Sequence, residues 1–338
     1  MLSTVPGRTR STGRLIDSEY IASHFHKIGE LGIPDLESFR LASIAIQRER
    51  NPVYKRFDGF TYLPVQAFKR KPVVSFPVEE AEAVFISSGT AKTASRSRHY
   101  VKHLDVYHRS VVNHFRAVHG GGKRVILAHL PSYIESRGTS SLVTMVQILI
   151  DEFGLPGSQF FLDVMPPESV LSSGPVLLFG AAFGLIVLAE SGSFQLPDDA
   201  LIIETGGMKA HGREMSRADL HTELAQGFGI GRTQVTSEYG MCELLSQFYM
   251  RDNGLFYPPP WVSFVILDPA DARTPLPEGE TGALAIFDAA NIYSVSSILT
   301  QDKAIRRGSG VDLLGRFSGA ELRGCNFLVE ERIGTSSD

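Results

Sequence analysis

The chain has 338 residues, of which 43% are hydrophobic and 21% are charged. This balance is typical of a globular protein and excludes a disordered or fibrous one. The formal net charge of −4 gives no sign of a basic surface for nucleic acid or anionic lipid. We therefore expect the partner to be a small molecule or another protein.

The apolar runs and the cysteines predict a cytoplasmic protein without a membrane span. The first residues carry arginines and turn-forming residues but no apolar core of a signal peptide. The longest apolar run, residues 175–189, is shorter than the roughly 20 residues that span a bilayer. Two cysteines, Cys242 and Cys325, are too few for a disulfide framework, which suits a reducing compartment.

Short β-branched runs alternate with helical stretches, which predicts an α/β fold. Four nearly continuous apolar segments are predicted as buried parallel strands: residues 83–88, 124–130, 175–180 and 200–205. Apolar residues three or four positions apart predict a helix over residues 100–118, which the following glycines end. A buried helix is expected after a tight turn at Gly180. Beyond about residue 250, shorter strands joined by turns predict a smaller sheet.

A hydroxyl-rich loop with a glycine, residues 87–95, follows the first predicted strand. Its backbone N–H groups, its hydroxyls and Lys92 can surround phosphate oxygens. The spacing is not that of a Walker A loop, and a loop of this composition taken alone is more often a solvated turn.

A second candidate is the segment 237–243, which is predicted to lead into a helix over residues 244–249. Tyr239 can stack on a nucleotide base. Glu243 can hold Mg²⁺ beside phosphates, because magnesium usually takes one or two protein carboxylates. Taken alone, the segment is equally typical of an acidic helix cap.

Two patterns are interpreted as structural. The glycines of residues 227–231 have the wrong spacing for a dinucleotide loop and predict a turn from a helix to a strand. His99 and His103 lie four residues apart without a third ligand, so we interpret them as ordinary histidines at the surface or the edge of the core.

In their order along the chain, these motifs resemble those of the adenylate-forming superfamily of acyl-CoA synthetases. The matching segments are the phosphate loop 87–95, the glycine pair in 204–207, the aromatic-Gly-x-Thr-Glu motif at 239–243, the Thr-Gly-Asp motif at 300–302 and the strand and hinge at 315–324. Cys242 stands where the superfamily usually has threonine, and a thiol is a weaker donor to phosphate than a hydroxyl.

Within the superfamily, residues 83–329 are most similar to the LuxE-type acyl-protein synthetases of bacterial luminescence. The resemblance implies that a carboxylic acid, expected to be a long-chain fatty acid, reacts with ATP in the presence of Mg²⁺ to give an acyl-adenylate. The acyl group then moves to a cysteine as a thioester and on to an acyl-reductase or acyl-carrier partner. Cys325, two residues from Arg323, is the expected acceptor, although a small buried residue would be the preferred interpretation without the resemblance.

The resemblance also implies roles for single residues. Cys325, Lys92 and Glu243 are expected to be catalytic, with Glu243 as the Mg²⁺ ligand. Tyr239 is expected beside the adenine, and Asp302 and Arg316 beside the ribose and phosphate. The complete set expected to bind the nucleotide is Ser87, Ser88, Gly89, Thr90, Gly206, Gly207, Glu238, Tyr239, Gly240, Cys242, Asp302 and Arg316.

The implied fold is the α/β large-domain fold of adenylate-forming enzymes, with layered sheets. Residues 1–250 are expected to form a nucleotide- and acyl-binding core, and residues 251–338 a smaller β-rich segment with a hinge-like motif and a cysteine-bearing tail. Because only a short tail follows Gly324, the superfamily's mobile C-terminal domain is expected to be absent or vestigial, and the lysine that assists adenylation is unassigned.

Two other functions remain open from the sequence. An aryl- or acyl-CoA ligase resembling phenylacetate-CoA ligase would pass the acyl group to coenzyme A instead of Cys325. A catalytically weak scaffold subunit would bind a reductase or carrier protein and would explain the change at Cys242. The acyl chain length, its aromaticity, the final acceptor, the pathway and the oligomeric state do not follow from the residues.

Overall fold

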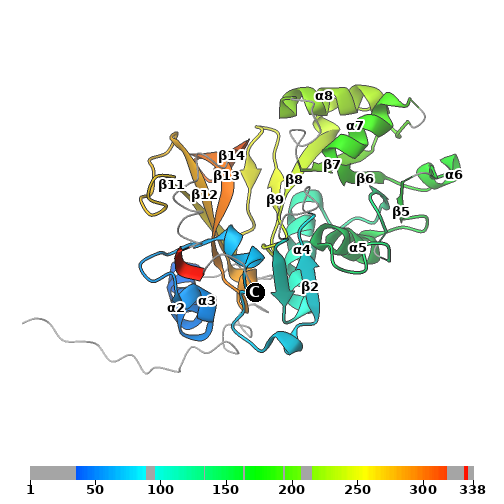
Figure 1. The fold of residues 1–338 in the computed structure, drawn as a ribbon. Helices are drawn as coiled ribbons and strands as arrows, with labels where there is room; N and C mark the ends of the chain where they lie inside the picture. Colours follow the sequence, from blue (N-terminus) through cyan, green and yellow to red (C-terminus); the bar gives the residue numbers. More distant parts are fainter. Residues whose placement is uncertain are drawn as a thin grey trace, which may run out of the picture.

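A computed structural model of the chain (Figure 1) describes residues 36–88, 96–132, 134–162, 164–192, 195–206, 215–317 and 331–333. These residues form a 12-stranded mixed sheet, a separate two-stranded sheet and the helices that cover them. None of the described helices is both long and apolar enough to cross a bilayer.

The parallel half of the large sheet confirms three predicted strands. Its order is β5-β4-β6-β7-β8, and the strands are β4 (Val125–His129), β5 (Gln159–Phe161), β6 (Val176–Ala181), β7 (Leu201–Thr205) and β8 (Val235–Tyr239). Alternate residues of β4 belong to two different cores, since Ile126 packs with one cluster and Leu127 with the other. A strand buried on both faces needs an unbroken apolar run, which is the pattern that the sequence shows.

Helices cover both faces of these strands. In Figure 1, α4 (Leu104–His119) and α5 (Ser141–Phe153) lie on one side of the sheet, and α7 (Ala182–Glu190) and α8 (Arg217–Phe228) lie on the other. The helix predicted over residues 100–118 is confirmed as α4, which ends at Gly120 with φ of +81°. The helix expected after β6 is confirmed as α7.

The prediction of a buried parallel strand over residues 83–88 is wrong. Strand β2 (Ala83–Ile86) pairs antiparallel with β3 (Arg98–Val101) in the two-stranded sheet and does not join the large sheet. Only Phe85 of β2 is buried, so the strand has one packed face. A short apolar run indicates a strand, but it does not indicate which strand pairs with it.

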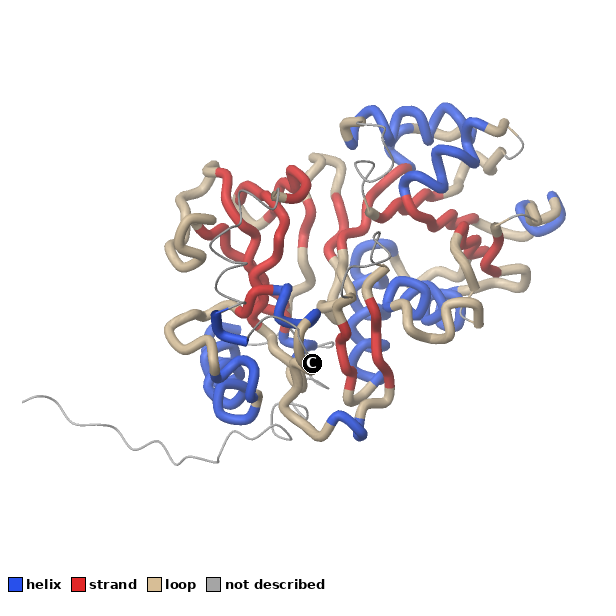
Figure 2. Tube along the Cα trace, viewed as in Figure 1, coloured by secondary structure: helices blue, strands red, loops and turns tan. Residues whose placement is uncertain are grey.

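The prediction of a smaller sheet after residue 250 is wrong, because the β-rich segment continues the same large sheet in antiparallel order. From β8 outward the order is β9-β10-β14-β13-β12-β11, and Figure 2 shows these strands (red) beside the parallel half. The strands are β9 (Phe248–Met250), β10 (Phe256–Tyr257), β11 (Val262–Leu267), β12 (Thr281–Asp288), β13 (Ser297–Arg307) and β14 (Gly310–Arg316). The division into residues 1–250 and 251–338 stays a prediction, although the change from parallel to antiparallel pairing falls between β8 and β9.

The helix predicted over residues 244–249 is wrong. Residues 244–247 are irregular and bend into β9, residues 248 and 249 belong to β9 itself, and all six residues are buried. A helix at the edge of the core would leave a polar face in water, whereas this segment has water on no side and pairs its last residues with β8.

The N-terminal described segment packs beside β13. It contains α2 (Leu36–Arg50), α3 (Pro52–Lys55) and β1 (Leu63–Pro64), which pairs parallel with β13. Asn51 caps α3 by accepting from the N–H groups of Val53 and Tyr54. The remaining short elements are α6 (Glu168–Leu171) and the 3-10 helices η1 (Val65–Lys69), η2 (Val78–Glu80), η4 (Arg232–Gln234) and η5 (Ala289–Asn291).

Replacing Gly227 by alanine is expected to destabilise the fold. A Cβ at this position in α8 would lie 2.6 Å from the Cβ and 3.2 Å from the Cα of Ala189 in α7. Such overpacking costs about 1–3 kcal/mol and outweighs the gain in helix propensity of at most about 1 kcal/mol. Urea unfolding is the measurement, with Gly122→Ala as a control because no atom lies within 4 Å of its Cβ. Equal stability of the two variants would contradict the close packing of α7 on α8.

Candidate functional site

The carboxyl ends of β7 and β8 bring two of the sequence motifs together. Thr205 and Glu238 are direct partners in the parallel pair, so Gly206 and Tyr239 follow at the same edge of the sheet. The Thr205 hydroxyl donates to Glu238 Oε2 at 2.5 Å. In open α/β sheets this edge is where ligands bind.

Three residues expected to bind the nucleotide meet at this edge. The Tyr239 hydroxyl donates to Asp302 Oδ2 at 2.7 Å, and Arg316 Nε lies 3.4 Å from Asp302 Oδ1. Asp302 and Arg316 face each other across β13 and β14. The sequence placed these residues in three separate motifs, and the fold joins them in one cluster.

Within the cluster of Tyr239, Asp302 and Arg316, the Asp302 carboxyl is buried and the Arg316 side chain is exposed to solvent. Burial raises the pKa of the Asp302 carboxyl, and the Arg316 guanidinium works against that shift. The Arg316 side chain is 77% exposed, so it can turn toward a ligand. The Tyr239 ring packs edge-on against Phe248 and Phe256, and its predicted contact with adenine stays a prediction.

Glu243 lies near the base of the predicted phosphate loop. Its residue is only 6% exposed, and burial raises the pKa of its carboxyl while nearby Ser97, Arg316 and Lys69 lower it. Ser97 in turn joins the base of the loop, because its N–H donates to Ser87 Oγ at 3.0 Å and its carbonyl accepts from the Ser87 N–H at 3.1 Å. The structure therefore places Ser87 and Glu243 around a shared neighbour. Ser88, the next residue of the predicted loop, is exposed.

The Glu238 side chain leaves no room for a Cβ at Gly240 unless its carboxyl group moves. A Cβ at this position would lie 2.5 Å from Glu238 Oε1. Gly206 has a φ of +88°, in the region that favours glycine. The other predicted site residues, Gly89, Thr90, Lys92, Gly207 and Cys325, lie outside the described residues.

Glu243 lies in the buried turn 242–247 between β8 and β9. This turn is held by residues that sequence reasoning missed. Asp288 accepts from the Leu245 N–H at 3.0 Å and from the Ser246 hydroxyl at 2.7 Å, and Asn291 Nδ2 donates to the Glu243 carbonyl at 2.7 Å. Burial raises the pKa of Asp288 to about 6. In the sequence, the only signal of Asp288 and Asn291 was that two polar residues stand at the end of a long apolar run.

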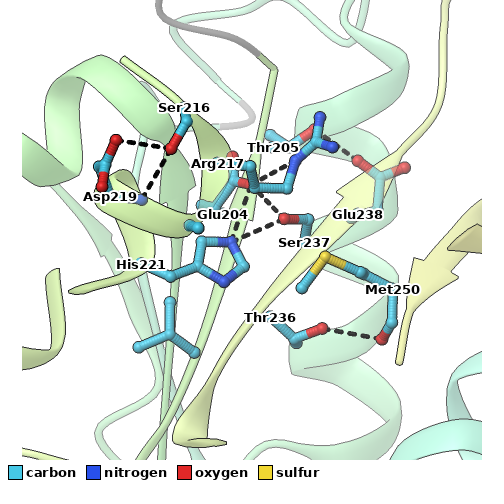
Figure 3. A network of polar contacts seen from close by, with 12 residues as sticks. Glu204, Thr205, Ser216, Arg217, Asp219, His221, Thr236, Ser237, Glu238 and Met250 are labelled. Atoms are coloured by element: carbon cyan, nitrogen blue, oxygen red, sulfur yellow. Dashed lines mark hydrogen bonds and ion pairs between the residues drawn. The ribbon is translucent and has the colours of Figure 1, made fainter. Parts of the chain in front are cut away.

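A buried polar network ties α8 to the ends of β7 and β8 (Figure 3). His221 Nε2 lies 2.9 Å from Ser237 Oγ and 3.4 Å from Glu204 Oε1, and the Ser237 hydroxyl donates to the same Glu204 oxygen. Arg217 Nε lies 3.8 Å from that oxygen. The serine, histidine and glutamate are each at most 1% exposed. They do not have the geometry of a nucleophilic triad, because the serine and the glutamate share one ring nitrogen and all three side chains are buried.

The two patterns interpreted as structural have different outcomes. The glycines of residues 227–231 form the predicted turn, since α8 ends at Phe228 and Gly229 adopts φ of +74° before β8. His103 lies partly exposed at the surface, with Nδ1 3.2 Å from Glu82 Oε1. For His99 the expected place is wrong, because it is 1% exposed and lies in the core.

Comparisons with known proteins agree with this architecture. ATP-bound MatB from Rhodopseudomonas palustris is similar with a TM-score of 0.52 and 18% identity, over 72% of this chain and 49% of that one. A 2-hydroxyisobutyryl-CoA ligase in complex with 2-HIB-AMP and CoA is similar with a TM-score of 0.57 and 13% identity, over 89% of this chain and 69% of that one. The fold is that of the adenylate-forming enzymes, as predicted.

Sequence comparison shows which proteins of this fold the chain is similar to. The family model described as acyl-protein synthetase, LuxE, matches residues 168–334. The long-chain-fatty-acid–luciferin-component ligase of Vibrio harveyi is 26% identical over 41% of this chain and 39% of that protein. The predicted resemblance to the LuxE-type acyl-protein synthetases is thus confirmed. The chain spans about two fifths of the length of this curated relative and about half that of MatB.

The stability of the protein is expected to fall between about pH 4.5 and 7 because of Glu238. Burial raises the pKa of this carboxyl from 4.5 to about 7, and the charge of Glu204 adds to the shift. In that pH window the unfolded chain releases the proton first, so rising pH favours unfolding. Between pH 5 and pH 7, the free energy of unfolding measured in urea is expected to fall less for Glu238→Gln than for the wild type.

The exposed Glu280 supplies the control for this prediction. Glu280→Gln should keep the wild-type dependence on pH. If Glu238→Gln also kept the wild-type dependence of stability on pH, the Glu238 carboxyl would not be the cause of that dependence.

Proposed function

We propose that the protein activates a carboxylic acid, in the first place a fatty acid, as an acyl-adenylate with ATP. The acyl group then passes to Cys325 as a thioester for delivery to a reductase or another acceptor. The observation that carries the proposal is the cluster of Tyr239, Asp302 and Arg316, with Glu243 near Arg316. The match to the LuxE family over residues 168–334 supports the same reaction.

In the first step, a carboxylate oxygen of the acid attacks the α-phosphorus of ATP. The bond from the α-phosphorus to the oxygen that bridges it to the β-phosphorus breaks, and pyrophosphate leaves. In this proposal Asp302 would accept from the ribose hydroxyls, and the exposed Arg316 would pair with the phosphate oxygens.

The surroundings of Glu243 fit a magnesium ion. Burial alone disfavours its ionised form, so a divalent cation bound to ATP would replace the lost hydration of the carboxylate. One carboxylate together with phosphate oxygens and water is the donor set that Mg²⁺ takes most often. The ion would neutralise charge on the polyphosphate when the two anions approach each other.

In the second step, a cysteine thiolate attacks the acyl carbon, the bond to the AMP oxygen breaks, and AMP leaves. The thiol proton passes to solvent or to a base. The chain has 2 cysteines. Cys242 is buried, and burial raises the pKa of its thiol well above the usual range, so it stays protonated and unreactive. The acceptor in this proposal is therefore Cys325.

Intact-protein mass spectrometry tests the acceptor. Wild-type protein incubated with ATP, Mg²⁺ and a panel of fatty and aromatic acids is expected to gain the mass of one acyl group. The gain should require ATP, disappear with hydroxylamine and be absent from Cys325→Ser. Cys242→Ser is the matched control and is expected to gain the same acyl mass by the end of the reaction, whatever its rate, because its thiol is not the nucleophile.

Other outcomes identify the other functions. Acylation lost in Cys242→Ser but kept in Cys325→Ser would contradict the assignment of the acceptor. Release of AMP only after coenzyme A is added, with no acylated protein, would indicate a CoA ligase. A folded protein that forms no AMP with any acid would indicate a scaffold.

A further inference from the structure

His99 connects the predicted phosphate loop to the turn that carries Glu243. It lies in β3, the strand that follows the loop, and it is 1% exposed. One ring nitrogen, Nδ1, lies 3.0 Å from the Cys242 carbonyl oxygen. The other, Nε2, lies 2.9 Å from Ser294 Oγ. The two contacts span 143 and 195 positions of the chain.

The partners of the ring fix its tautomer. A carbonyl oxygen only accepts, so Nδ1 carries the proton and donates to Cys242, while Nε2 accepts from the Ser294 hydroxyl. Burial lowers the pKa of His99 to about 4, so the ring is neutral near pH 7 and keeps one donor and one acceptor. The edge-to-face contact with Phe68, at 5.5 Å between ring centroids, restricts rotation of the ring.

Ser294, which His99 Nε2 contacts, is fixed in the core. The Ser294 carbonyl accepts from Asn51 Nδ2 at 3.2 Å, and the Ser294 N–H donates to the Asn291 carbonyl at 3.1 Å. Ser294 itself is 2% exposed. His99 is thus held on one side by an immobile hydroxyl and can hold the turn on the other.

Two consecutive carbonyls of the turn are bound from different directions. His99 holds the carbonyl of Cys242 from β3, and Asn291 Nδ2 holds the carbonyl of Glu243 at 2.7 Å from the segment after β12. Fixing both carbonyls fixes the peptide planes before and after the Glu243 Cα. The direction of its Cα–Cβ bond follows from those two planes.

We propose that His99 is a positioning residue, which holds the Cys242 carbonyl and thereby directs the Glu243 carboxylate toward the nucleotide phosphates. The inference rests on the proposed function for its catalytic consequence. The anchoring of the turn itself does not depend on that function.

The test compares His99→Leu with two variants. His99→Gln keeps a side-chain donor and is the conservative replacement. His114→Leu removes another buried histidine, whose ring packs on Tyr249 and Trp261, and is the matched control for loss of a core histidine.

Two readouts separate anchoring from function. Amide hydrogen exchange in residues 240–247 is expected to become at least about tenfold faster in His99→Leu, less so in His99→Gln, and unchanged in His114→Leu. The Mg²⁺ concentration that half-saturates acid-dependent exchange of pyrophosphate into ATP is expected to rise about tenfold in His99→Leu, with the KM for the acid within about threefold.

Each result has one meaning. Unchanged amide exchange in folded His99→Leu would overturn the proposal, as would equal rises in the Mg²⁺ requirement for His99→Leu and His114→Leu. If the wild type exchanged no pyrophosphate with any acid, the proposed function would fail, and amide exchange would still decide the anchoring. If His99→Leu did not fold, the same two readouts on His99→Gln would decide.

Discussion

The buried turn between β8 and β9 is the constraint on which the site depends. Its backbone N–H and carbonyl groups and the Glu243 carboxylate leave water, and each buried polar group without a partner costs about 1–3 kcal/mol. Asp288, Asn291 and His99 supply partners for three of the backbone groups. These contacts favour the conformation of the turn that provides them and thereby hold the backbone of Glu243.

The same interactions join the two halves of the molecule. Ser246 lies at the centre, since its hydroxyl oxygen is 2.9 Å from Ser110 Oγ of α4 and 2.9 Å from Trp261 Nε1, while Asp288 accepts its proton. The helix belongs to the parallel part of the fold, and Trp261 and Asp288 belong to the antiparallel part. A site built at this junction can take residues from both parts, and Tyr239 and Asp302, which we expect to bind nucleotide, come from the two parts and contact each other.

Local composition predicted the hydroxyl-rich loop and the Tyr239 motif as candidate sites, and the family resemblance added Asp302. The structure brings Tyr239 and Asp302 together, whereas most of the loop lies outside the described residues. The supporting contacts were missed because His99 and Asp288 lie 143 and 43 positions from the residues they hold, and no local pattern encodes such a distance. The turn was predicted as a helix because an apolar run without a clear period does not distinguish a helix from buried irregular structure.

The central claim is that these contacts assemble a site that joins a carboxylic acid to AMP. The most direct measurement is the exchange of labelled pyrophosphate into ATP by the wild-type protein, with and without Mg²⁺ and with each acid of a panel. The account predicts exchange that requires both Mg²⁺ and one class of acid, since the reversal of adenylation needs the acyl-adenylate. A well-folded protein that exchanges no label with any acid would contradict it.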